Sequence, residues 1–498
     1  MFKKKNYKDL LIYAQKLIEI DRLENEYNYQ LAYAFEISNN LSDAIKYYKK
    51  YLDKNGKSKK QAFNNIGCIY LKKNKPIIAI DFFLQGLNLG EDKIIINNTF
   101  KCYVMLRDSV NSDLYYDKAQ KIDKNYIEFK HTKAKYLILK NQITEAIEFL
   151  EKNKDEPRFL ITLIVLYFNL GKNEEGKKLL IQSKDKMKKD PEFCNFIGLR
   201  LLYEGNFKDG WKFHDNRYSK KVDFFKNIKE WTGEKIENKS IVVFNEQGLG
   251  DSIQFSKYII SLCKIAKKVT FVVQENIKDL FKEELQNLTI ETIESCKNKE
   301  FDLKIALGSL IKFFFEEKFK KSENLIQSNK DLDLKWKNNI SLDRLNVGIA
   351  WSGNFNGPNE PYRSIPLEKL RGLFSLDVNF YCLQKEIWVR DLDYFKSLNL
   401  INCGKYKLNE IASIIQNLDL IISCDTSLLH LSASLNKETW GILSLHPDWR
   451  WGEFNKINPY SSLKNFKQKN FQDWGEIEEL IITELKRKID TFKSSIKP

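Results

Sequence analysis

Residues 241–251 read Ile-Val-Val-Phe-Asn-Glu-Gln-Gly-Leu-Gly-Asp, a short apolar run followed by a loop with two glycines and a carboxylate. Such a run predicts a buried strand, and residues 252–262 then have the pattern of a helix. Gly248 and Gly250 allow the backbone to turn sharply and to approach a bound group. The loop lacks the third glycine of a dinucleotide motif and the Gly-Lys-Ser/Thr ending of a P-loop. It therefore predicts either a ligand site or a merely tight strand-to-helix turn.

A second strand, polar elbow and helix occur near the end of the chain. Residues 419–424 are Asp-Leu-Ile-Ile-Ser-Cys, and Asp425, Thr426 and Ser427 follow as good N-cap residues. A helix that begins there would direct unpaired N–H groups and a positive dipole end at the elbow, which favours a phosphate. The alternative is that these residues only cap the helix. Two such elbows favour a ligand bound between two doubly wound domains and contacted from both.

The length and composition indicate a globular protein of several domains. At 498 residues the chain is too long for one core and fits three units of ordinary size. It has no run of about eighteen apolar residues, and Gln15 and Lys16 interrupt the segment after the basic start Met-Phe-Lys-Lys-Lys. The eight cysteines form no Cys-x-x-Cys pair and have no histidine at metal spacing. We therefore expect a cytoplasmic protein with free thiols in a reducing compartment.

The formal charge of +15 comes from lysines spread along the whole chain. A dispersed charge is typical of a solvated surface and predicts no nucleic-acid partner. It leaves open a peripheral contact with an anionic membrane surface.

The first 220 residues show a helical repeat. Four pairs of small residues are twelve positions apart, and each second member is followed four residues later by Tyr48, Phe83, Leu150 or His214; the pairs are Ala32 and Ala44, Gly67 and Ala79, Ala134 and Ala146, and Gly198 and Gly210. This spacing indicates tetratricopeptide-type repeats, although residues 97–130 fit it poorly. Such solenoids present a concave groove to a partner, and the alternative is a passive spacer or a dimerisation arm.

After a linker at 221–239 the pattern changes to short β-rich runs alternating with amphipathic helices. A polar stretch at 322–339 separates two groups of strands, which predicts Rossmann-like domains at 240–335 and 340–470. In the last segment, 471–498, an amphipathic helix at 474–489 is expected to cross back to the first of these domains. The predicted strands are 241–244, 269–273, 288–291, 303–306, 347–351, 378–383, 418–423 and 441–445.

Six motifs in order carry a family resemblance that covers nearly the whole chain: Glu246-Gln-Gly-Leu-Gly-Asp-Ser-Ile-Gln-Phe255, Trp351-Ser-Gly-Asn354, Arg363-Ser-Ile-Pro-Leu367, Leu383-Gln384, Asp425-Thr426 with His430, and His446-Pro-Asp-Trp-Arg-Trp451. The chain resembles bacterial glycosyltransferases that join tetratricopeptide repeats to a GT-B catalytic region. These are related to the heptosyltransferase family and more distantly to O-linked N-acetylglucosamine transferases. The resemblance implies an α plus α/β fold, a helical solenoid followed by a GT-B pair of Rossmann-like domains.

The resemblance also implies a reaction and a set of site residues. A sugar would pass from a nucleotide-sugar donor to a protein or glycan acceptor, in an inverting reaction, with the repeats recruiting the acceptor. Asp251 matches the position of the proposed base, and its alternative role is to cap the helix that follows. The donor-binding residues would be Gly248, Gly250, Ser352, Gly353, Asn354, Arg363, Ser364, Gln384, Lys385, Asp425, Thr426, Ser427 and His430.

These donor-binding residues have distinct expected roles. Arg363 would place positive charge beside the leaving diphosphate, and Asp425 would accept from a sugar hydroxyl. His430 is either a ligand contact or a buried, hydrogen-bonded histidine. The Asp-Leu-Asp runs at 331–333 and 391–393 are spacings that arise by chance in a chain rich in acids. We therefore expect neither a metal nor another cofactor. An alternative function is a tetratricopeptide interaction scaffold whose transferase fold is no longer catalytic.

Overall fold

The computed structural model describes residues 26–54, 56–187, 189–218, 225–282, 284–296, 299–314, 324–354, 360, 362–452 and 459–496. The chain divides into two compact units. The first contains Met1–Phe149 with the short segments Asn354–Gly357 and Trp388–Arg390, and the second contains the rest. The basic start of the chain and the interruption at residues 15 and 16 lie outside the described residues.

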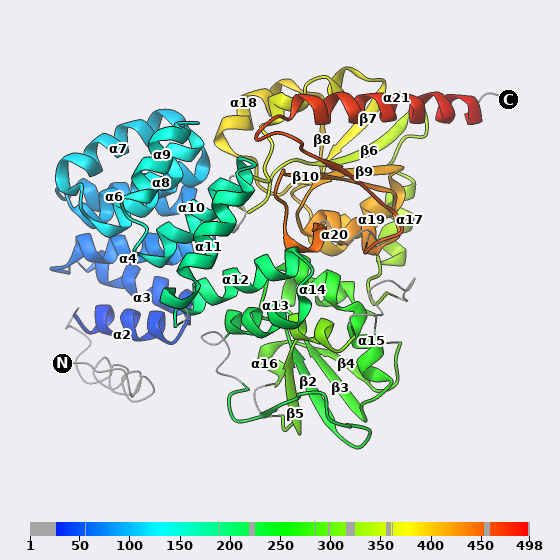
Figure 1. Cartoon of the computed structure of the whole chain (residues 1–498), viewed down its shortest axis with the longest axis horizontal. Helices are drawn as coiled ribbons and strands as arrows, with labels where there is room; N and C mark the ends of the chain where they lie inside the picture. The colour runs from blue at the N-terminus through cyan, green and yellow to red at the C-terminus, as the bar shows by residue number, and fades with distance from the viewer. Residues whose placement is uncertain are drawn as a thin grey trace. The chain divides into compact units, whose positions relative to one another are not determined.

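The first unit is built from helical hairpins, drawn in blue and cyan in Figure 1. The small residues of the predicted repeats are packed inside this unit. Ala32, Ala44 and Ala79 are fully buried. A methyl group on Gly67 would lie 2.4 Å from the ring of Phe83, so the two helices of that hairpin approach too closely for a side chain. Its helices are α2 Glu26–Ile37, α3 Leu41–Asp53, α4 Lys59–Lys72, α5 Pro76–Leu87, α6 Lys93–Leu106, α7 Ser109–Asp123, α8 Ile127–Leu139 and α9 Ile143–Glu151.

Residues 97–130, which fit the repeat pattern poorly, nevertheless form the hairpin of α6 and α7 and the start of α8. Phe100 stands where a small residue is expected, and it packs on Tyr116 at 5.9 Å and on Tyr136 at 5.6 Å between ring centroids. Tyr116 and Tyr136 stack at 4.8 Å. An aromatic cluster thus replaces the small-residue contact while the helical repeat continues.

Helical segments continue through α13 and the short helix η1 Asp215–Tyr218, while the two compact units divide earlier in the chain. Four further helices, α10 Pro157–Asn169, α11 Asn173–Met187, α12 Pro191–Tyr203 and α13 Phe207–His214, group with the second unit. A methyl group on Gly198 would lie 2.4 Å from the backbone nitrogen of His214, so the repeat packing persists here. These helices group with the second unit because their side chains pack on its α/β domains, as Leu202 and Trp211 do in the shared hydrophobic core.

The first Rossmann-like domain contains a parallel five-stranded sheet with the order β1-β5-β2-β3-β4. The strands are β1 Lys229–Glu230, β2 Ser240–Phe244, β3 Lys268–Val272, β4 Leu288–Glu291 and β5 Leu303–Ala306. β1 lies inside the predicted linker, where Trp231 is buried against Phe313. The second half of that linker is therefore part of this domain.

The second Rossmann-like domain contains a parallel six-stranded sheet with the order β11-β10-β9-β6-β7-β8. The strands are β6 Leu345–Ala350, β7 Val378–Cys382, β8 Ile401–Asn402, β9 Leu420–Cys424, β10 Thr439–Leu443 and β11 Leu463–Lys467. In the first sheet the strand order reverses beside β2, which precedes the glycine loop. In the second sheet it reverses between β6 and β9, and β9 precedes the elbow at Asp425. Ligands of open α/β sheets bind at the carboxyl ends of strands at such points.

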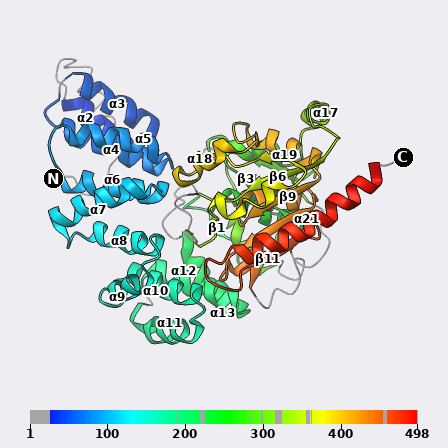
Figure 2. The same ribbon diagram turned by 90° about the horizontal axis from the view of Figure 1, so that it is seen from above.

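Two helices differ from their predicted placement. α17 Lys330–Lys337 packs on α19 Leu408–Asn417, with Lys335 Nζ 2.9 Å from Glu410 Oε1, and so belongs to the second Rossmann-like domain. α21 Gly475–Ile496 does not cross to the first domain. Its apolar face packs on the second sheet, because Ile477, Ile481 and Leu485 share a core with Val347. Figure 2 shows α21 beside β11.

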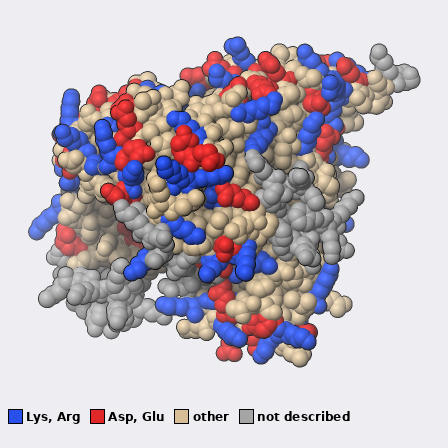
Figure 3. Space-filling model, viewed as in Figure 1, with Lys and Arg blue, Asp and Glu red and all other residues tan. Residues whose placement is uncertain are grey.

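Surface charge and cysteines agree with the sequence-based description. On the face shown in Figure 3 the basic and acidic side chains are interspersed. None of the eight cysteines is in a disulfide, and seven are buried. Of the helices that the structure describes, none combines the length and apolarity needed to cross a membrane.

Candidate functional site

The glycine loop joins β2 to the helix α14 Leu249–Phe255, and a second helix, α15 Lys257–Cys263, follows after Ser256. The predicted helix at 252–262 is therefore two short helices. Neither glycine has a positive φ, so a sharp left-handed turn does not explain them. A methyl group on Gly250 would instead lie 3.0 Å from Cδ2 of His430 and 3.5 Å from Cα of Ser427. This glycine allows the first domain to touch the helix α20 Ser427–Ser434 of the second domain.

Asp251 stands at this contact and uses both of its carboxylate oxygens. Oδ2 accepts a hydrogen bond from the backbone N–H of Gly248 at 2.9 Å, which caps α14. Oδ1 forms an ion pair with Arg450 of the second domain. Asp251 therefore caps α14 and also pairs with Arg450 of the second domain.

Arg450 lies in the short helix η7 Trp449–Trp451 and pairs with Asp251 of the other domain. Its Nη1 is 2.6 Å from Asp448 Oδ1, and its guanidinium lies 5.1 Å from the ring centroid of Phe255. Burial alone would lower the pKa of Arg450, but the carboxylates of Asp448, Asp251 and Asp425 raise it. A buried cation is therefore fixed beside the candidate base.

The second elbow begins α20 as predicted, with Thr426 as the N-cap residue. Burial raises the pKa of Asp425, although Arg363 and Arg450 act in the opposite direction. His430 lies one turn inside the helix, with Nδ1 3.0 Å from the Tyr460 hydroxyl and Nε2 3.7 Å from Asp425 Oδ1. Burial, and then Arg450, lowers the pKa of His430 to about 3, so this ring is neutral at physiological pH.

The segment after β6 brings Arg363 to the same elbow. Arg363 donates to the backbone oxygen of Asp425 at 3.1 Å and pairs with Glu360 at 3.0 Å. Its guanidinium lies on Gly353, where a methyl group would be 2.5 Å from Nη2. Ser364 Oγ accepts from the N–H of Gly353 at 3.1 Å and donates to Glu360 at 2.6 Å. Arg363, Gly353, Ser364 and Asp425 are therefore in one cluster.

The side chain of Gln384 makes hydrogen bonds to the protein itself. Its Oε1 accepts from the N–H groups of Trp351 and Ser352 at 3.1 and 2.8 Å, and its Nε2 donates to Ser352 Oγ at 2.6 Å. It thereby ties the ends of β6 and β7 together. Lys385 is exposed, and Asn354 groups with the first unit.

The sequence reasoning missed the roles of Arg450 and Lys257. Arg450 belongs to a quoted motif, where an Asp-x-Arg run just after a buried strand was the available signal. Lys257 begins α15 and makes neither an ion pair nor a hydrogen bond in the described part of the chain. Burial lowers its pKa to about 8, and its charge contributes to lowering the pKa of His430. It adds a cation whose charge reaches His430.

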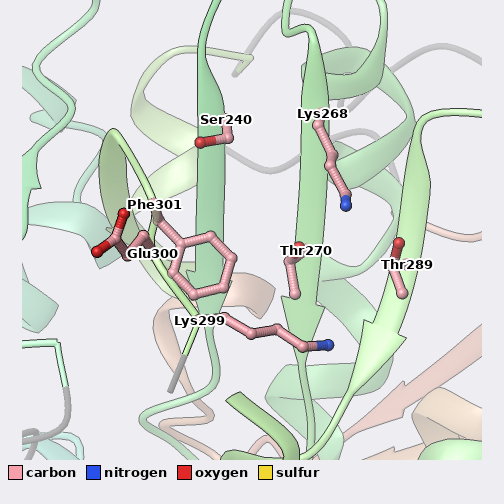
Figure 4. Close-up of a pocket in the computed structure, with 7 residues that line it drawn as sticks. All are labelled: Ser240, Lys268, Thr270, Thr289, Lys299, Glu300 and Phe301. Atoms are coloured by element: carbon pink, nitrogen blue, oxygen red, sulfur yellow. The ribbon is translucent and has the colours of Figure 1, made fainter. Parts of the chain in front are cut away.

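Two further observations concern the described residues outside this cluster. Within the described ranges, no group of three or more His, Cys, Asp or Glu side chains is arranged to hold a metal ion. A pocket of about 280 Å³ lies on the first sheet, and Figure 4 shows the seven residues that line it. It includes Ser240 and Lys268, which begin β2 and β3, and so lies away from the glycine loop at the other end of β2. We assign it no part in the site.

A family model described as glycosyltransferase family 9 (heptosyltransferase) matches residues 384–479. This range contains α20 and Arg450, whereas Asp251 and Arg363 lie outside it. The match supports a glycosyltransferase, as the sequence resemblance implied. No curated protein sequence matches the chain.

Three solved structures are distantly similar. A family 9 glycosyl transferase from Veillonella parvula DSM 2008 is 14% identical, with 51% of this chain and 98% of that chain covered at a TM-score of 0.39. The ADP-heptose LPS heptosyltransferase II of E. coli is 12% identical, with 51% and 99% covered at 0.38. A tetratricopeptide repeat protein from Parabacteroides merdae ATCC 43184 is 12% identical, with 44% and 94% covered at 0.37. The enzyme class rests on the family match.

Proposed function

We propose that this glycosyltransferase moves a sugar from a nucleotide-sugar donor to a protein or glycan acceptor, with inversion and without a bound metal. The observation that carries the proposal is the meeting of Asp251, from the first Rossmann-like domain, with Arg450 and the start of α20 in the second. A carboxylate and a cation on opposite sides of one contact suit a reaction that needs a base for one partner and positive charge for the other.

In the proposed reaction Asp251 takes the proton of the acceptor hydroxyl. The acceptor oxygen forms a bond to the anomeric carbon while the bond from that carbon to the diphosphate oxygen breaks. The electron pair leaves with the diphosphate, which carries growing negative charge. The guanidinium groups of Arg363 and Arg450 and the N–H groups that begin α20 supply the opposite charge. Attack of the acceptor oxygen from the face opposite the leaving group inverts the anomeric centre.

The absence of a metal requirement is part of the proposal. Two arginines and a helix start would do the work that a divalent cation does in other transferases. Activity should then be unchanged in the presence of a chelator. Loss of activity that added magnesium or manganese restores would contradict this part.

The repeats are proposed to recruit the acceptor. Solenoids of this kind bind partners through extended concave surfaces, and the helices α10–α13 lie in the same compact unit as the catalytic domains. The acceptor class, protein or glycan, follows from an activity screen with both kinds of substrate.

The first test is thermal unfolding of the full chain with a panel of nucleoside diphosphates and nucleotide sugars. A ligand at about a hundredfold over its Kd adds roughly 2.7 kcal/mol of stability. We expect one nucleotide to raise the midpoint and the variant Arg363→Ala to lose most of that shift. If no nucleotide shifts the midpoint, the donor site fails and the scaffold function becomes the better explanation.

The second test concerns the base. Asp251→Asn should abolish transfer while nucleotide affinity stays near that of the parent. Asp279→Asn is the matched control, because Asp279 is exposed on the same domain. Loss of nucleotide affinity together with transfer in Asp251→Asn would show that the residue acts through the α14 cap.

A further inference from the structure

The segment His446–Trp451, which carries Asp448 and Arg450, is held by the last repeat helices. The ring of His446 lies between Phe168 of α10, at 5.0 Å and 82°, and Tyr203 of α12, at 4.8 Å and 71°. Arg200 of α12 places its Nη1 3.1 Å from Nε2 of His446. Three side chains of the repeats thus surround one residue of the catalytic domain.

Arg200 is itself fixed in this position. Its guanidinium lies 3.9 Å from the ring centroid of Phe168 and 4.7 Å from that of Tyr203, and its Nε is 2.9 Å from Glu204 Oε1. Only 9% of the residue is exposed. Burial, and then the charges of Arg200 and Lys467, lowers the pKa of His446 to about 3. The ring is therefore neutral near pH 7, and because an arginine can only donate, Nε2 of His446 is the acceptor.

A second contact holds the same segment on the other side of Asp448. The indole of Trp449 meets that of Trp211, from α13, at 5.3 Å and 90°. Trp449 also stacks on Phe255 of α14 at 6.4 Å and 14°. The next residue is Arg450, whose guanidinium reaches Asp251. The segment therefore has anchors on α12 and α13 immediately before the arginine that joins the two domains.

We propose that Arg200 and His446 are positioning residues, through which the helices α10–α13 hold Arg450 in the orientation that binds the donor diphosphate. This inference rests on the proposed function in one respect, which is that Arg450 contacts the diphosphate. It adds that the repeats contribute to the donor site itself as well as to acceptor recruitment. A cation held in place before binding gives higher affinity than one that must be ordered by the ligand.

The test is binding of inorganic pyrophosphate to the full chain, measured by calorimetry in the absence of any acceptor. Arg200→Met removes the donor to His446 but keeps a long apolar side chain on the two rings. We expect its affinity to fall by roughly 2- to 30-fold, the range for residues that act through another group. Arg158→Met is the matched control, since Arg158 pairs with Glu156 on the outside of α10 and is 44% exposed. Its affinity should equal that of the parent.

Two further variants separate positioning from folding. His446→Phe keeps the ring between Phe168 and Tyr203 but removes the acceptor, so it should weaken binding as Arg200→Met does. Arg200→Lys retains a donor and should recover part of the lost affinity. Combined with Arg450→Lys, Arg200→Met should cost less than the sum of the single losses, because both act on one contact.

The outcomes are distinguishable from failure of the proposed function. If the parent binds neither pyrophosphate nor any nucleoside diphosphate, the donor site and this inference fail together. If the parent binds and both Arg200→Met and His446→Phe bind equally well, only the positioning role is overturned. Additive losses with Arg450→Lys would overturn it too, because Arg200 would then act by another route.

Discussion

Replacement of Arg450 by methionine should destabilise the protein, and the loss should depend on pH. Arg450 is 12% exposed in its side chain and faces the carboxylates of Asp251 and Asp448. Methionine fills much of the volume but leaves these carboxylates without their cation. Breaking a buried ion pair from one side costs about 3–5 kcal/mol. Because Asp251 is 22% exposed, we expect the lower end of that range, roughly 3 kcal/mol near pH 8.

The pH dependence follows from Asp448 and Asp425. Burial raises the pKa of each, and Arg450 acts against that rise. In Arg450→Met both values should rise further. An acid whose pKa is higher in the folded state binds more protons folded than unfolded, so stability falls as pH rises from the unfolded value of about 4 through the folded value. The loss in Arg450→Met should therefore be largest at pH 8 and smaller at pH 5.

Urea unfolding followed by circular dichroism at pH 5 and pH 8 measures the effect as the shift in the unfolding midpoint of the catalytic domains. Arg344→Met is the matched control, because Arg344 is 52% exposed and pairs with Asp377 at the surface, and it should cause no measurable loss. Adding Asp448→Asn to Arg450→Met should restore part of the stability at pH 8. Equal losses at the two pH values would refute the argument from unpaired carboxylates.

Four further outcomes are expected. Lys257→Met should be more stable than the parent at pH 7, and the difference should vanish near pH 10.5. The pKa of Lys257 is about 8 in the folded protein and about 10.4 in the unfolded chain, so the stability of the parent rises with pH between those values. Equal unfolding midpoints at pH 7 would contradict this. Gly198→Ala should lower the thermal midpoint strongly, since its methyl group would lie 2.4 Å from a backbone nitrogen of α13, whereas Gly475→Ala, with 3.6 Å of space, should not. Gly353→Ala should weaken nucleotide binding with little loss of stability, because the flexible guanidinium of Arg363 must move away from 2.5 Å; unchanged affinity by calorimetry would count against that contact. Nucleotide sugars should bind more tightly at pH 6 than at pH 8 in the same calorimetric assay, and a flat profile would argue against proton uptake by the buried carboxylates.

The strands of the two sheets could be predicted where they are buried on both faces. β4 and β5 have the predicted bounds, and β2, β3, β6, β7, β9 and β10 differ by one or two residues at their ends. Parallel strands between helices are continuous apolar runs, which sequence reveals directly. β1 and β8 have two residues each, and β11, Leu-Lys-Asn-Phe-Lys, has only two apolar residues among its five. These three lie outside the central apolar strands, so no apolar run marks them.

The site was predicted in its local parts and missed in its long-range ones. The two elbows are local patterns of strand, turn and cap, and the structure places Arg363 on the backbone oxygen of Asp425 and Asp251 beside Arg450. The ion pair of Asp251 with Arg450 joins residues that are 199 positions apart. No periodicity or spacing encodes such a contact. The same holds for the attachment of His446 to the repeats, through which α10–α13 belong to one compact unit with the catalytic domains.

The charge count of the site explains why its carboxylates matter for the donor. The cluster contains two arginines and four carboxylates: Arg363, Arg450, Asp251, Glu360, Asp425 and Asp448. With every group ionised, the carboxylates of this cluster outnumber its arginines by two. Two of the carboxylates, Asp425 and Asp448, have a raised pKa, so they are the ones that a second anion would drive to accept protons. The diphosphate of a nucleotide sugar does not titrate between pH 6 and 8, so tighter binding at the lower pH would reflect protons taken up by the protein. In the free protein the two arginines would then pair with the buried carboxylates and stabilise the fold. When the donor binds, these carboxylates would take up protons, and the same arginines would pair with the phosphates of the leaving group.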